Sequence, residues 1–526
     1  MKAIILYVQA AASVLLLSAC SHIGSKANSP EYLDSASENR LSIEEWQPEN
    51  AQVNHHETIW TRIIAAYQLD INIENPQITA QLNWYKARQD YLDRVTERGE
   101  RYLHYIAEQI EARNIPGEIA LLPIVESAFE PFAYSHGRAS GVWQFIPATG
   151  RDFGLREDWW QDGRRDIRAS TEAALTYLDS LQREFNGDWL LALAAYNSGA
   201  GTVRKAMRAN RAKGKNVDFW SLNLPRETRD YVPKLIALAK LVRNPEQYGV
   251  TLAPIPDEPY FAAVATGGQI DLAQVAELAQ TSVDEIYHLN PSYSRWATHP
   301  DGPHEILIPY EQQAAFAENI AQLPLSERVK WQNYKVKQGD TLNSIARHFQ
   351  TTPDVLKTVN KLHKTALRKG QDLLIPSSML AANEYSQSAN QRLERLITAR
   401  QPANTVRNEH SVSSGETFWN IAKRYKVGVK ELARWNGMAP KDPLKAGQKI
   451  VVWSTEKQAK SFAAPLEREK VVRKISYKVR SGDSLARISQ KFNVNIADVQ
   501  RWNPNQKQSK YLRPGQVLTL HVNVIR

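Results

Sequence analysis

One pattern occurs three times in the C-terminal part of the chain, and it constrains the fold more than any other feature. Each copy has a glycine, an acidic residue and a threonine or serine in a row, and an asparagine follows the glycine by 21 residues. Each copy then reaches a Gly-Gln pair and a short apolar stretch. The periodicity predicts the order strand, helix, helix, strand, with the acidic residue near a helix start, where negative charge is favoured. These residues are Gly339, Asp340, Thr341 and Asn360, then Gly415, Glu416, Thr417 and Asn436, then Gly482, Asp483, Ser484 and Asn503.

The three copies resemble LysM modules, which are small α+β domains (βααβ) that bind glycans containing N-acetylglucosamine. The resemblance places modules at residues 334–377, 410–453 and 477–521. It implies a shallow groove between the first turn and the end of the second helix, where the residues named above contact the acetamido group. For each of them, the alternative that it only shapes a turn or a cap remains open. The polar linkers are typical of flexible connections between independently mobile modules, and several weak sites on one strand add avidity.

A less regular unit precedes these copies. Residues 255–310 contain similar motifs in a similar order, but the spacing from Gly267 to Asn290 is two residues longer than in the other copies. We expect this unit to be a degenerate LysM-like domain.

The charge of the chain is divided unevenly. Residues 331–526 carry 35 lysine and arginine residues against 14 aspartate and glutamate residues, whereas the whole chain carries 66 against 56. A basic half is compatible with nucleic-acid binding, but an export signal and the lack of any nucleic-acid-binding motif argue against it. The stem peptides of peptidoglycan carry carboxylates, so a basic binding array gains a long-range attraction to the cell wall that salt weakens.

The first 20 residues have the pattern of an export signal. Lys2 is followed by a mostly apolar run that is too short for a spanning helix with flanks. The run closes with Leu-Ser-Ala-Cys, which resembles the bacterial lipoprotein cleavage box, and Cys20 is the only cysteine of the chain. We therefore expect a lipid on Cys20 that tethers the mature N-terminus to a membrane. A buried cysteine behind an ordinary signal peptide is the alternative.

The residues after the cysteine predict the location and the start of the folded part. Ser21 follows Cys20, which by analogy with Gram-negative sorting favours the periplasmic side of the outer membrane. Residues 21–50 are polar and typical of a flexible tether. Residues 51–115 have helical spacing and predict a helical leader that packs on the domain after it. We expect its aromatic residues, including Trp84 and Tyr85, to belong to the core, and a glycan subsite is the alternative.

Glu126 is a single acid at the end of an apolar run. The helix that contains it is expected to start near Pro116, whose missing N–H suits a first helical position. Glu126 then lies near the C-terminal end, where apolar neighbours and the negative end of the helix dipole disfavour the ionised carboxylate. The pKa of Glu126 should therefore be raised, as a general acid requires. A glutamate that only caps or hydrogen-bonds inside a core is the alternative.

Three further stretches carry polar groups suited to a sugar substrate. Gln144 is the one amide in an aromatic and apolar stretch, and it offers donors and acceptors for an N-acetyl group or for hydroxyls. Tyr196 and Asn197 lie at the end of an apolar helix, and Tyr231 offers a phenol that can hydrogen-bond an acid. Singly, each of these residues is more often structural than functional.

Together and in this order, these motifs resemble the lysozyme-like catalytic domain of the lytic transglycosylases of glycoside hydrolase family 23, over residues 116–245. The resemblance implies a mainly α domain in which Glu126 is the only catalytic acid. Val142 and Trp143 replace the family's Leu-Met pair, which makes the shape of the subsite less certain. The resemblance implies substrate contacts from Ser127, Gln144, Tyr196, Asn197 and Tyr231. The whole chain is thus expected to be multidomain, with a mainly α lysozyme-like catalytic domain followed by small α+β LysM modules on flexible linkers.

The resemblance also implies the reaction. In such enzymes the acid protonates the oxygen between N-acetylmuramic acid and N-acetylglucosamine, then takes a proton from the muramoyl 6-hydroxyl, which closes a 1,6-anhydro ring. Ordinary glycosidases need two carboxylates, but here the substrate's acetamido oxygen and hydroxyl can replace the second one. Four aspartates between the motifs could supply a second carboxylate, and nothing in the sequence singles one out: Asp152, Asp158, Asp162 and Asp166.

Two other functions remain open. The first is a muramidase that cleaves the same bond with water, and the second is a noncatalytic wall-binding lipoprotein. No Cys/His cluster has zinc-ligand spacing, no Gly-rich loop precedes a phosphate-binding Lys-Ser/Thr pair, and no Ser-His-Asp set is apparent. The sequence therefore predicts no metal and no cofactor, with peptidoglycan strands and a membrane as partners.

Overall fold

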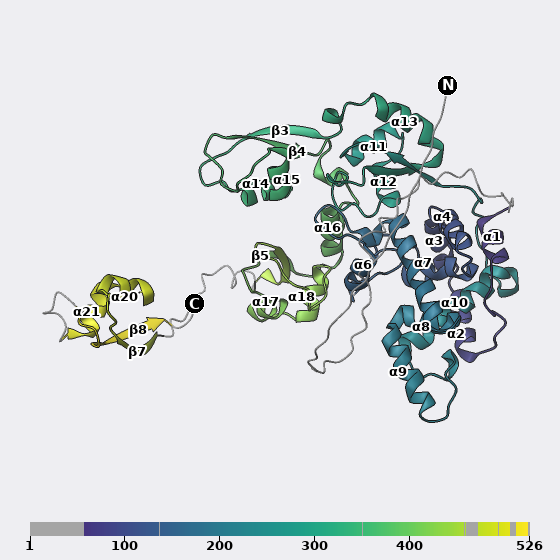
Figure 1. Cartoon of the computed structure of the whole chain (residues 1–526), viewed down its shortest axis with the longest axis horizontal. Helices are drawn as coiled ribbons and strands as arrows, with labels where there is room; N and C mark the ends of the chain where they lie inside the picture. The colour runs from purple at the N-terminus through teal and green to yellow at the C-terminus, as the bar shows by residue number, and fades with distance from the viewer. Residues whose placement is uncertain are drawn as a thin grey trace, which may run out of the picture. The chain divides into compact units, whose positions relative to one another are not determined.

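The computed structural model describes residues 57–523 apart from residues 136, 350, 457, 459–471, 493 and 505–511 (Figure 1). The expected signal segment, Cys20 and the tether lie outside the described residues. Among the described residues, no helix is both long and apolar enough to span a bilayer.

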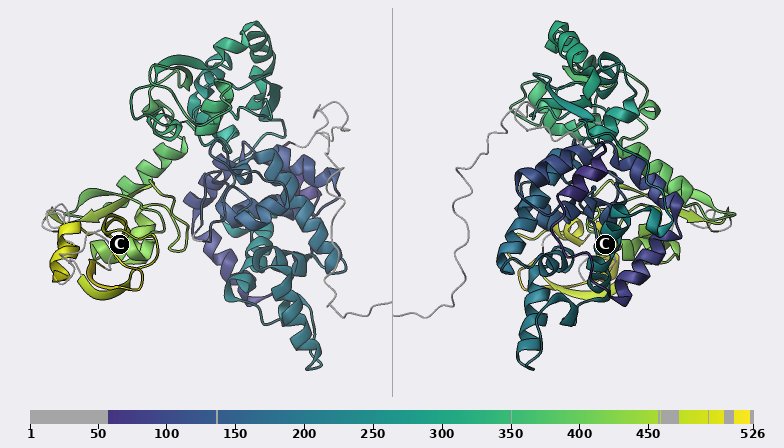
Figure 2. Two further views of the ribbon diagram at one scale, coloured as in Figure 1. Left: turned by 60° about the vertical axis from the view of Figure 1, so that its left-hand side comes forward. Right: turned by 90° about the vertical axis from the view of Figure 1, so that its right-hand side faces the viewer.

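Four helices form the leader. They are α1 (Ile59–Ala65), α2 (Pro76–Lys86), α3 (Gln89–Gly99) and α4 (Leu103–Ala112). The side chains of Thr58 and Asn75 cap α1 and α2, because each accepts a hydrogen bond from a backbone N–H in the first turn. The buried faces of these helices join the same hydrophobic core as the helices that follow. The leader and the next helices therefore make one helical body (Figure 2).

The stretch that follows the leader is helical, as expected. Its elements are η2 (Gly117–Leu121), α5 (Leu122–Ser127), α6 (Pro147–Asp152), η3 (Gly163–Arg165), α7 (Ile167–Glu184), α8 (Trp189–Ser198), α9 (Ala200–Arg211), η4 (Phe219–Ser221), α10 (Arg226–Arg243) and η5 (Glu246–Tyr248). Helix α8 is apolar on almost every side because it packs against α7, α9 and α10. The expected mainly α domain is confirmed.

A LysM-like domain comes next in the chain. It consists of β1 (Phe261–Ala265), α11 (Leu272–Leu278), α12 (Val283–Leu289), β2 (Glu305–Pro309), η6 (Tyr310–Gln312) and α13 (Gln313–Gln322). Strands β1 and β2 pair antiparallel, with Ala263 opposite Leu307. The domain is bonded to the helical body, since the N–H of Asp162 donates to Ser292 O (2.8 Å) and the hydroxyl of Tyr102 donates to His288 O (2.8 Å).

Each of the three C-terminal copies folds as strand, helix, helix, strand, which confirms the expected βααβ modules. The first contains β3 (Lys330–Lys335), α14 (Leu342–His348), α15 (Pro353–Val359) and β4 (Asp372–Ser377). The second contains β5 (Val406–Ser411), α17 (Phe418–Tyr425), α18 (Val429–Trp435) and β6 (Lys449–Ser454). The third contains β7 (Val472–Lys478), α20 (Leu485–Phe492), α21 (Ile496–Trp502) and β8 (Val517–Asn523). In each module the two strands pair antiparallel.

The modules differ from simple mobile units in one linker and carry the expected basic charge. The linker after the first module holds α16 (Ala389–Ala399). In that linker the buried hydroxyl of Tyr385 donates to the buried carboxylate of Asp271 (2.8 Å), so this linker is attached rather than free along its length.

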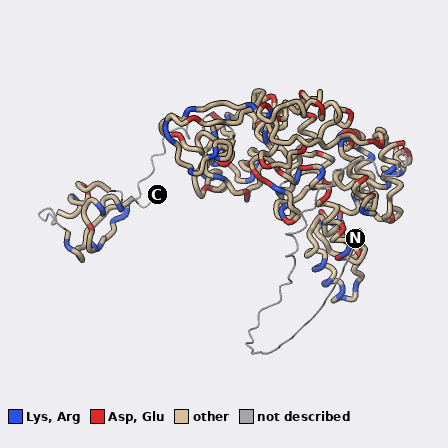
Figure 3. Tube along the Cα trace, turned by 45° about the horizontal axis from the view of Figure 1, so that its top comes forward, with Lys and Arg blue, Asp and Glu red and all other residues tan. Residues whose placement is uncertain are grey.

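In the described residues of the third module, lysine and arginine outnumber the acids Asp483 and Asp498 (Figure 3).

One asparagine in each unit joins the second helix to the closing strand. In the first module, Nδ2 of Asn360 donates to the carbonyl oxygens of Leu356 (2.9 Å) and Leu374 (2.8 Å), and its Oδ1 accepts from Leu374 N (2.7 Å). The corresponding three bonds are made by Asn436, Asn503 and, in the LysM-like domain, Asn290. Both amide hydrogens are used, so these side chains hold the fold together and are poorly placed for the glycan contact expected of Asn360, Asn436 and Asn503.

The acidic residues close the turn before the first helix. Oδ2 of Asp340 accepts from the N–H of Lys337 (2.7 Å) and from the hydroxyl of Tyr334 (2.8 Å). Asp483 and Glu416 accept the same backbone bond in their modules. The next residue caps the helix in each case: Thr341, Thr417 and Ser484. The preceding glycines have positive φ, which glycine adopts at low cost: Gly339, Gly415 and Gly482.

The asparagine cross-link predicts a local stability effect. Asn436→Ala leaves the buried backbone groups of Leu432 and Val451 without partners, which should cost about 3 kcal/mol. Hydrogen exchange of the full chain should then show about 100-fold less protection of the most protected amides between residues 410 and 453. The exposed Lys430→Ala on the same helix should leave this protection unchanged. Equal protection in both variants would show that the second module does not depend on the cross-link.

Candidate active site

Glu126 lies in the last turn of α5. The 3-10 turn η2 leads into this helix, whose residues Leu122 and Ile124 are buried, and the helix ends where Ala128 adopts the left-handed conformation with φ of 51°. The side chain of Glu126 is only partly exposed. The expected position near the C-terminal end of a helix is confirmed.

Tyr231 on α10 donates a hydrogen bond from its hydroxyl to Oε1 of Glu126. Burial raises the pKa of Glu126 from its ordinary 4.5 to about 7, although the hydrogen bond from Tyr231 and the charge of Lys234 act in the opposite direction. The charge of Glu227, one helical turn before Tyr231, adds to the rise. Burial also raises the pKa of Tyr231 well above its ordinary value, so the phenol stays protonated and keeps its proton for the bond to Glu126. The site therefore holds a carboxylic acid that is partly protonated near neutral pH.

Gln144 lies on a tight loop. At Gly141 (φ of 81°) a Cβ would lie 2.1 Å from the carbonyl oxygen of Arg164, so only glycine fits there. Gln144 also has positive φ (51°), and its Nε2 donates to Gly141 O (2.8 Å). Within the described residues, no hydrogen bond uses Oε1 of Gln144, so this oxygen remains available as an acceptor.

Two of the predicted site residues hold this loop in place. Ser127 Oγ lies 3.0 Å from Val142 O and 3.1 Å from Pro123 O, so it ties the end of α5 to the loop. The hydroxyl of Tyr196, at the end of α8, donates to Trp143 O (2.9 Å). Both residues lie beside the acid, but their hydroxyls are occupied by backbone bonds to the protein.

Val142 and Trp143, where the sequence departs from the family's Leu-Met pair, belong to the core. Both side chains are fully buried, and the indole N–H of Trp143 donates to Thr171 Oγ1 on α7 (2.9 Å). They therefore fill the core beneath the loop.

Asn197 links the end of α8 to α10. Its Oδ1 accepts a hydrogen bond from Thr228 Oγ1 (2.8 Å), which joins the end of α8 to α10 one turn before Tyr231. No hydrogen bond in the described part of the chain uses Nδ2 of Asn197. Thr228 was not singled out by the sequence, because a threonine in a helix carries no signal of this contact.

None of the four aspartates between the motifs bonds to Glu126. Asp162 is buried in an ion pair with Arg164 (2.8 Å), and Asp158 pairs with Arg156 (2.8 Å). Asp166 caps α7 through Ala169 N (2.9 Å), and Asp152 is exposed. Over the described ranges there is no group of three or more His, Cys, Asp or Glu side chains placed to hold a metal ion.

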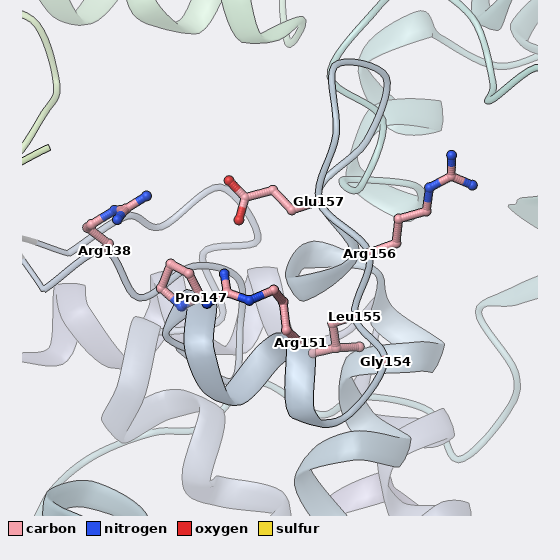
Figure 4. Close-up of a pocket in the computed structure, with 7 residues that line it drawn as sticks. All are labelled: Arg138, Pro147, Arg151, Gly154, Leu155, Arg156 and Glu157. Carbon is pink, nitrogen blue, oxygen red and sulfur yellow. The ribbon is translucent and has the colours of Figure 1, made fainter. Parts of the chain in front are cut away.

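A hollow of about 450 Å³ lies apart from Glu126, which does not line it. Figure 4 shows Arg138 and Glu157 pointing toward one another across it, while Arg156 is directed away. Its walls come from the start of α6 and the loop after that helix, with Pro147, Arg151, Gly154 and Leu155. Because neither Glu126 nor Tyr231 lines this hollow, it is separate from the candidate catalytic acid.

The fold and the site together define a lysozyme-like transglycosylase domain joined to LysM modules. Residues 104–219 match the family described as "Transglycosylase SLT domain", and residues 260–324 match "Lytic transglycosylase MltD, LysM-like domain". Residues 334–376, 410–453 and 477–520 match the LysM domain. The chain belongs to the family of membrane-bound lytic murein transglycosylase D.

The extent of similarity differs among known proteins. The chain is 36% identical over 443 residues to membrane-bound lytic murein transglycosylase D of Escherichia coli (strain K12), which covers 81% of this chain and 93% of the relative. It is 30% identical over 172 residues to an autolysin of Enterococcus faecalis, which covers 32% of this chain and 22% of that one. Among solved structures, lytic transglycosylase Slt of Pseudomonas aeruginosa, as an inactive mutant, is 26% identical over 29% of this chain and 25% of its own, with a TM-score of 0.23.

The raised pKa of Glu126 predicts how stability depends on pH. A carboxyl whose pKa is higher in the folded than in the unfolded state stabilises the fold fully below about pH 4.5, and this contribution is lost as pH rises through about 7. Glu126→Gln lacks this loss. Differential scanning calorimetry should therefore show the variant gaining about 2 to 6 °C in Tm over the parent between about pH 4.5 and pH 8.

A matched control is Glu318→Gln, which removes an exposed carboxylate on α13. Its Tm should follow the parent at each pH. A Glu126→Gln difference that does not change with pH would mean that the Glu126 carboxyl titrates like an ordinary glutamate.

Proposed function

We propose that this site cleaves the β-1,4 bond between N-acetylmuramic acid and N-acetylglucosamine in peptidoglycan without consuming water. The observation that carries the proposal is the single carboxyl of Glu126, partly protonated near neutral pH and hydrogen-bonded by Tyr231. Glu126 gives its proton to the bridge oxygen as the bond from that oxygen to the muramoyl C1 breaks, and the N-acetylglucosamine leaves with a 4-hydroxyl. The resulting carboxylate takes the proton of the muramoyl 6-hydroxyl. The oxygen of that hydroxyl bonds to C1, which closes the 1,6-anhydro ring.

The lack of a second bonded carboxylate supports the lytic reaction over hydrolysis. An inverting glycosidase needs a base for water, and a retaining one needs a carboxylate nucleophile about 5 Å from the acid. Among the described residues, the candidate aspartates are committed to arginines, to a helix cap or to solvent, and Glu227, whose charge raises the pKa of Glu126, is exposed. The substrate's acetamido oxygen can stabilise the positive charge at C1, and its hydroxyl is the nucleophile.

Gln144 and Asn197 are proposed to bind the sugars. Oε1 of Gln144 and Nδ2 of Asn197 are an acceptor and a donor that the protein's own hydrogen bonds leave free within the described residues. An acetamido group offers the complementary N–H and C=O. Ser127 and Tyr196 are positioning residues in this proposal, because they fix the loop that carries Gln144.

Products of digestion test the proposed reaction. Purified sacculi treated with the full chain should release muropeptides with 1,6-anhydromuramoyl ends. Mass spectrometry identifies these products because each is lighter by one water than the product with a reducing end. Glu126→Gln should lower the rate by at least about 1,000-fold, while Glu318→Gln should match the parent. Reducing muramic acid ends would identify a hydrolytic muramidase instead, and an inactive parent would identify a wall-binding protein.

The LysM modules are proposed to hold the enzyme on glycan strands, with the domain bounds expected from the sequence. Their first turns present Gly339 and Gly415 with open space above them, where a sugar can approach the backbone, while at Gly482 the guanidinium of Arg487 lies 3.8 Å from the Cβ position. Their excess of lysine and arginine adds attraction to the carboxylates of stem peptides. Because three modules share one strand, weak binding by each becomes strong retention.

Cys20 is proposed to carry the lipid that places the enzyme on the periplasmic side of the outer membrane. The support is the cleavage-box pattern that ends at the single cysteine, together with the name of the Escherichia coli relative, which describes it as membrane-bound. Peptidoglycan lies within the periplasm, so an anchor there keeps enzyme and substrate in one compartment.

Lipid labelling tests the anchor. In cells of a Gram-negative host given a clickable fatty acid, the parent chain should become labelled and fractionate with outer membranes. Cys20→Ser should lose the label and move to the soluble periplasmic fraction, while its purified form still digests sacculi. Labelling that survives Cys20→Ser would place the lipid elsewhere.

A further inference from the structure

Helix α2 presents an exposed indole that the sequence places in the core. Tyr85 is buried as expected, with 3% of its surface exposed, but its neighbour Trp84 is 40% exposed. Scattered exposed apolar residues are common on soluble proteins, so exposure alone indicates nothing. The surroundings of Trp84 are what distinguish it.

The indole of Trp84 is held in a built aromatic cluster. The rings of Tyr85 and Tyr91 meet it edge-to-face, each at a centroid distance of 5.2 Å. The guanidinium of Arg88 lies 4.3 Å from the centre of the indole and also donates to Trp84 O (2.9 Å). A side chain fixed on three sides loses little conformational freedom when a ligand binds to its remaining surface.

The cluster is connected to the helix that carries the acid. The hydroxyl of Tyr91 donates to the carbonyl oxygen of Ile124 (3.1 Å), two residues before Glu126. Further along α3, Arg98 forms an ion pair with Glu130 (2.9 Å), just beyond the end of α5. Helix α3 therefore runs beside the end of α5. The ring of Trp84 contacts the ring of Tyr91, which is on that helix.

A second connection runs through α10. Helix α2 packs along α10, the helix that carries Tyr231, with Ile78 and Tyr85 of α2 in the shared core. Trp84 is thus on a helix that packs against α10, which carries Tyr231. Its ring neighbour Tyr91 contacts α5, which carries Glu126.

We propose that Trp84 is a glycan-stacking subsite, on which a sugar ring remote from the cleaved bond lies against the indole. This rests on the proposed function, because the occupant is the same glycan strand that reaches Glu126. The C–H face of a pyranose is apolar and can pack on an exposed aromatic ring. The hydroxyls at the edge of the sugar then remain in water, as the polar edge of Trp does at other interfaces. Binding of a remote sugar supplies energy that positions the bond at Glu126, so the benefit appears only with substrates long enough to reach Trp84.

Substrate length separates this role from a structural one. The full chain, its LysM modules included, is assayed on purified peptidoglycan oligomers of two and of at least four disaccharide units. Trp84→Ala should lower kcat/KM about 3- to 10-fold on the long oligomers and leave it unchanged on the short ones. Trp84→Phe, which keeps a smaller ring, should fall between the parent and Trp84→Ala on the long oligomers.

The controls make each outcome decisive. Tyr310→Ala removes an exposed aromatic residue from the LysM-like domain and should leave both substrates unaffected. Equal loss of kcat/KM on short and long oligomers, or no loss on either, would overturn the subsite. The dependence of the Trp84→Ala loss on oligomer length does not depend on which product forms. Hydrolytic products, with a loss of kcat/KM on the long oligomers only, would therefore reject the lytic reaction and retain the subsite.

Discussion

The rest of the site depends on the removal of the Glu126 carboxyl from water. An ionised carboxylate in that position loses hydration that the phenol of Tyr231 and the charge of Lys234 do not replace, so burial raises the pKa of Glu126 to about 7. Tyr231 fixes the orientation of the carboxyl but slightly favours its ionised form. The arrangement suits a group that must donate a proton and then act as a base, because both forms are populated near neutral pH.

The surrounding structure serves to keep this carboxyl and its neighbours in one geometry. Helices α5, α8 and α10 each contribute one end or one face, and backbone hydrogen bonds from Ser127 and Tyr196 hold the loop with Gln144 between them. Behind the loop, the buried pair of Asp162 and Arg164 supports the turn at Gly141, since Arg164 donates to Phe145 O (3.3 Å). A rigid site of this kind needs no large rearrangement at the moment of proton transfer.

Periodicity and motif order predicted the helical catalytic domain, the end-of-helix position of Glu126 and the βααβ modules, because these follow from local patterns. The contact between Tyr231 and Glu126 followed from the family resemblance and not from spacing, since 105 residues separate the two. Other features depend on tertiary packing and left no local signal. The exposure of Trp84, the burial of Val142 and Trp143, and the bond between Tyr385 and Asp271 are of this kind. The repeated asparagine was visible in the sequence, but its role was not, because a binding amide and a structural amide look alike until their partners are known.

The protonation of Glu126 can be measured directly. Infrared spectra of the parent chain minus those of Glu126→Gln isolate the C=O stretch of this one protonated carboxyl, followed from about pH 4 to about pH 9. The band should disappear with a midpoint near pH 7, in line with the pKa of about 7 that burial produces. A midpoint near 4.5, the ordinary value for glutamate, would contradict the account, because the site would then hold an ionised carboxylate with no proton to give.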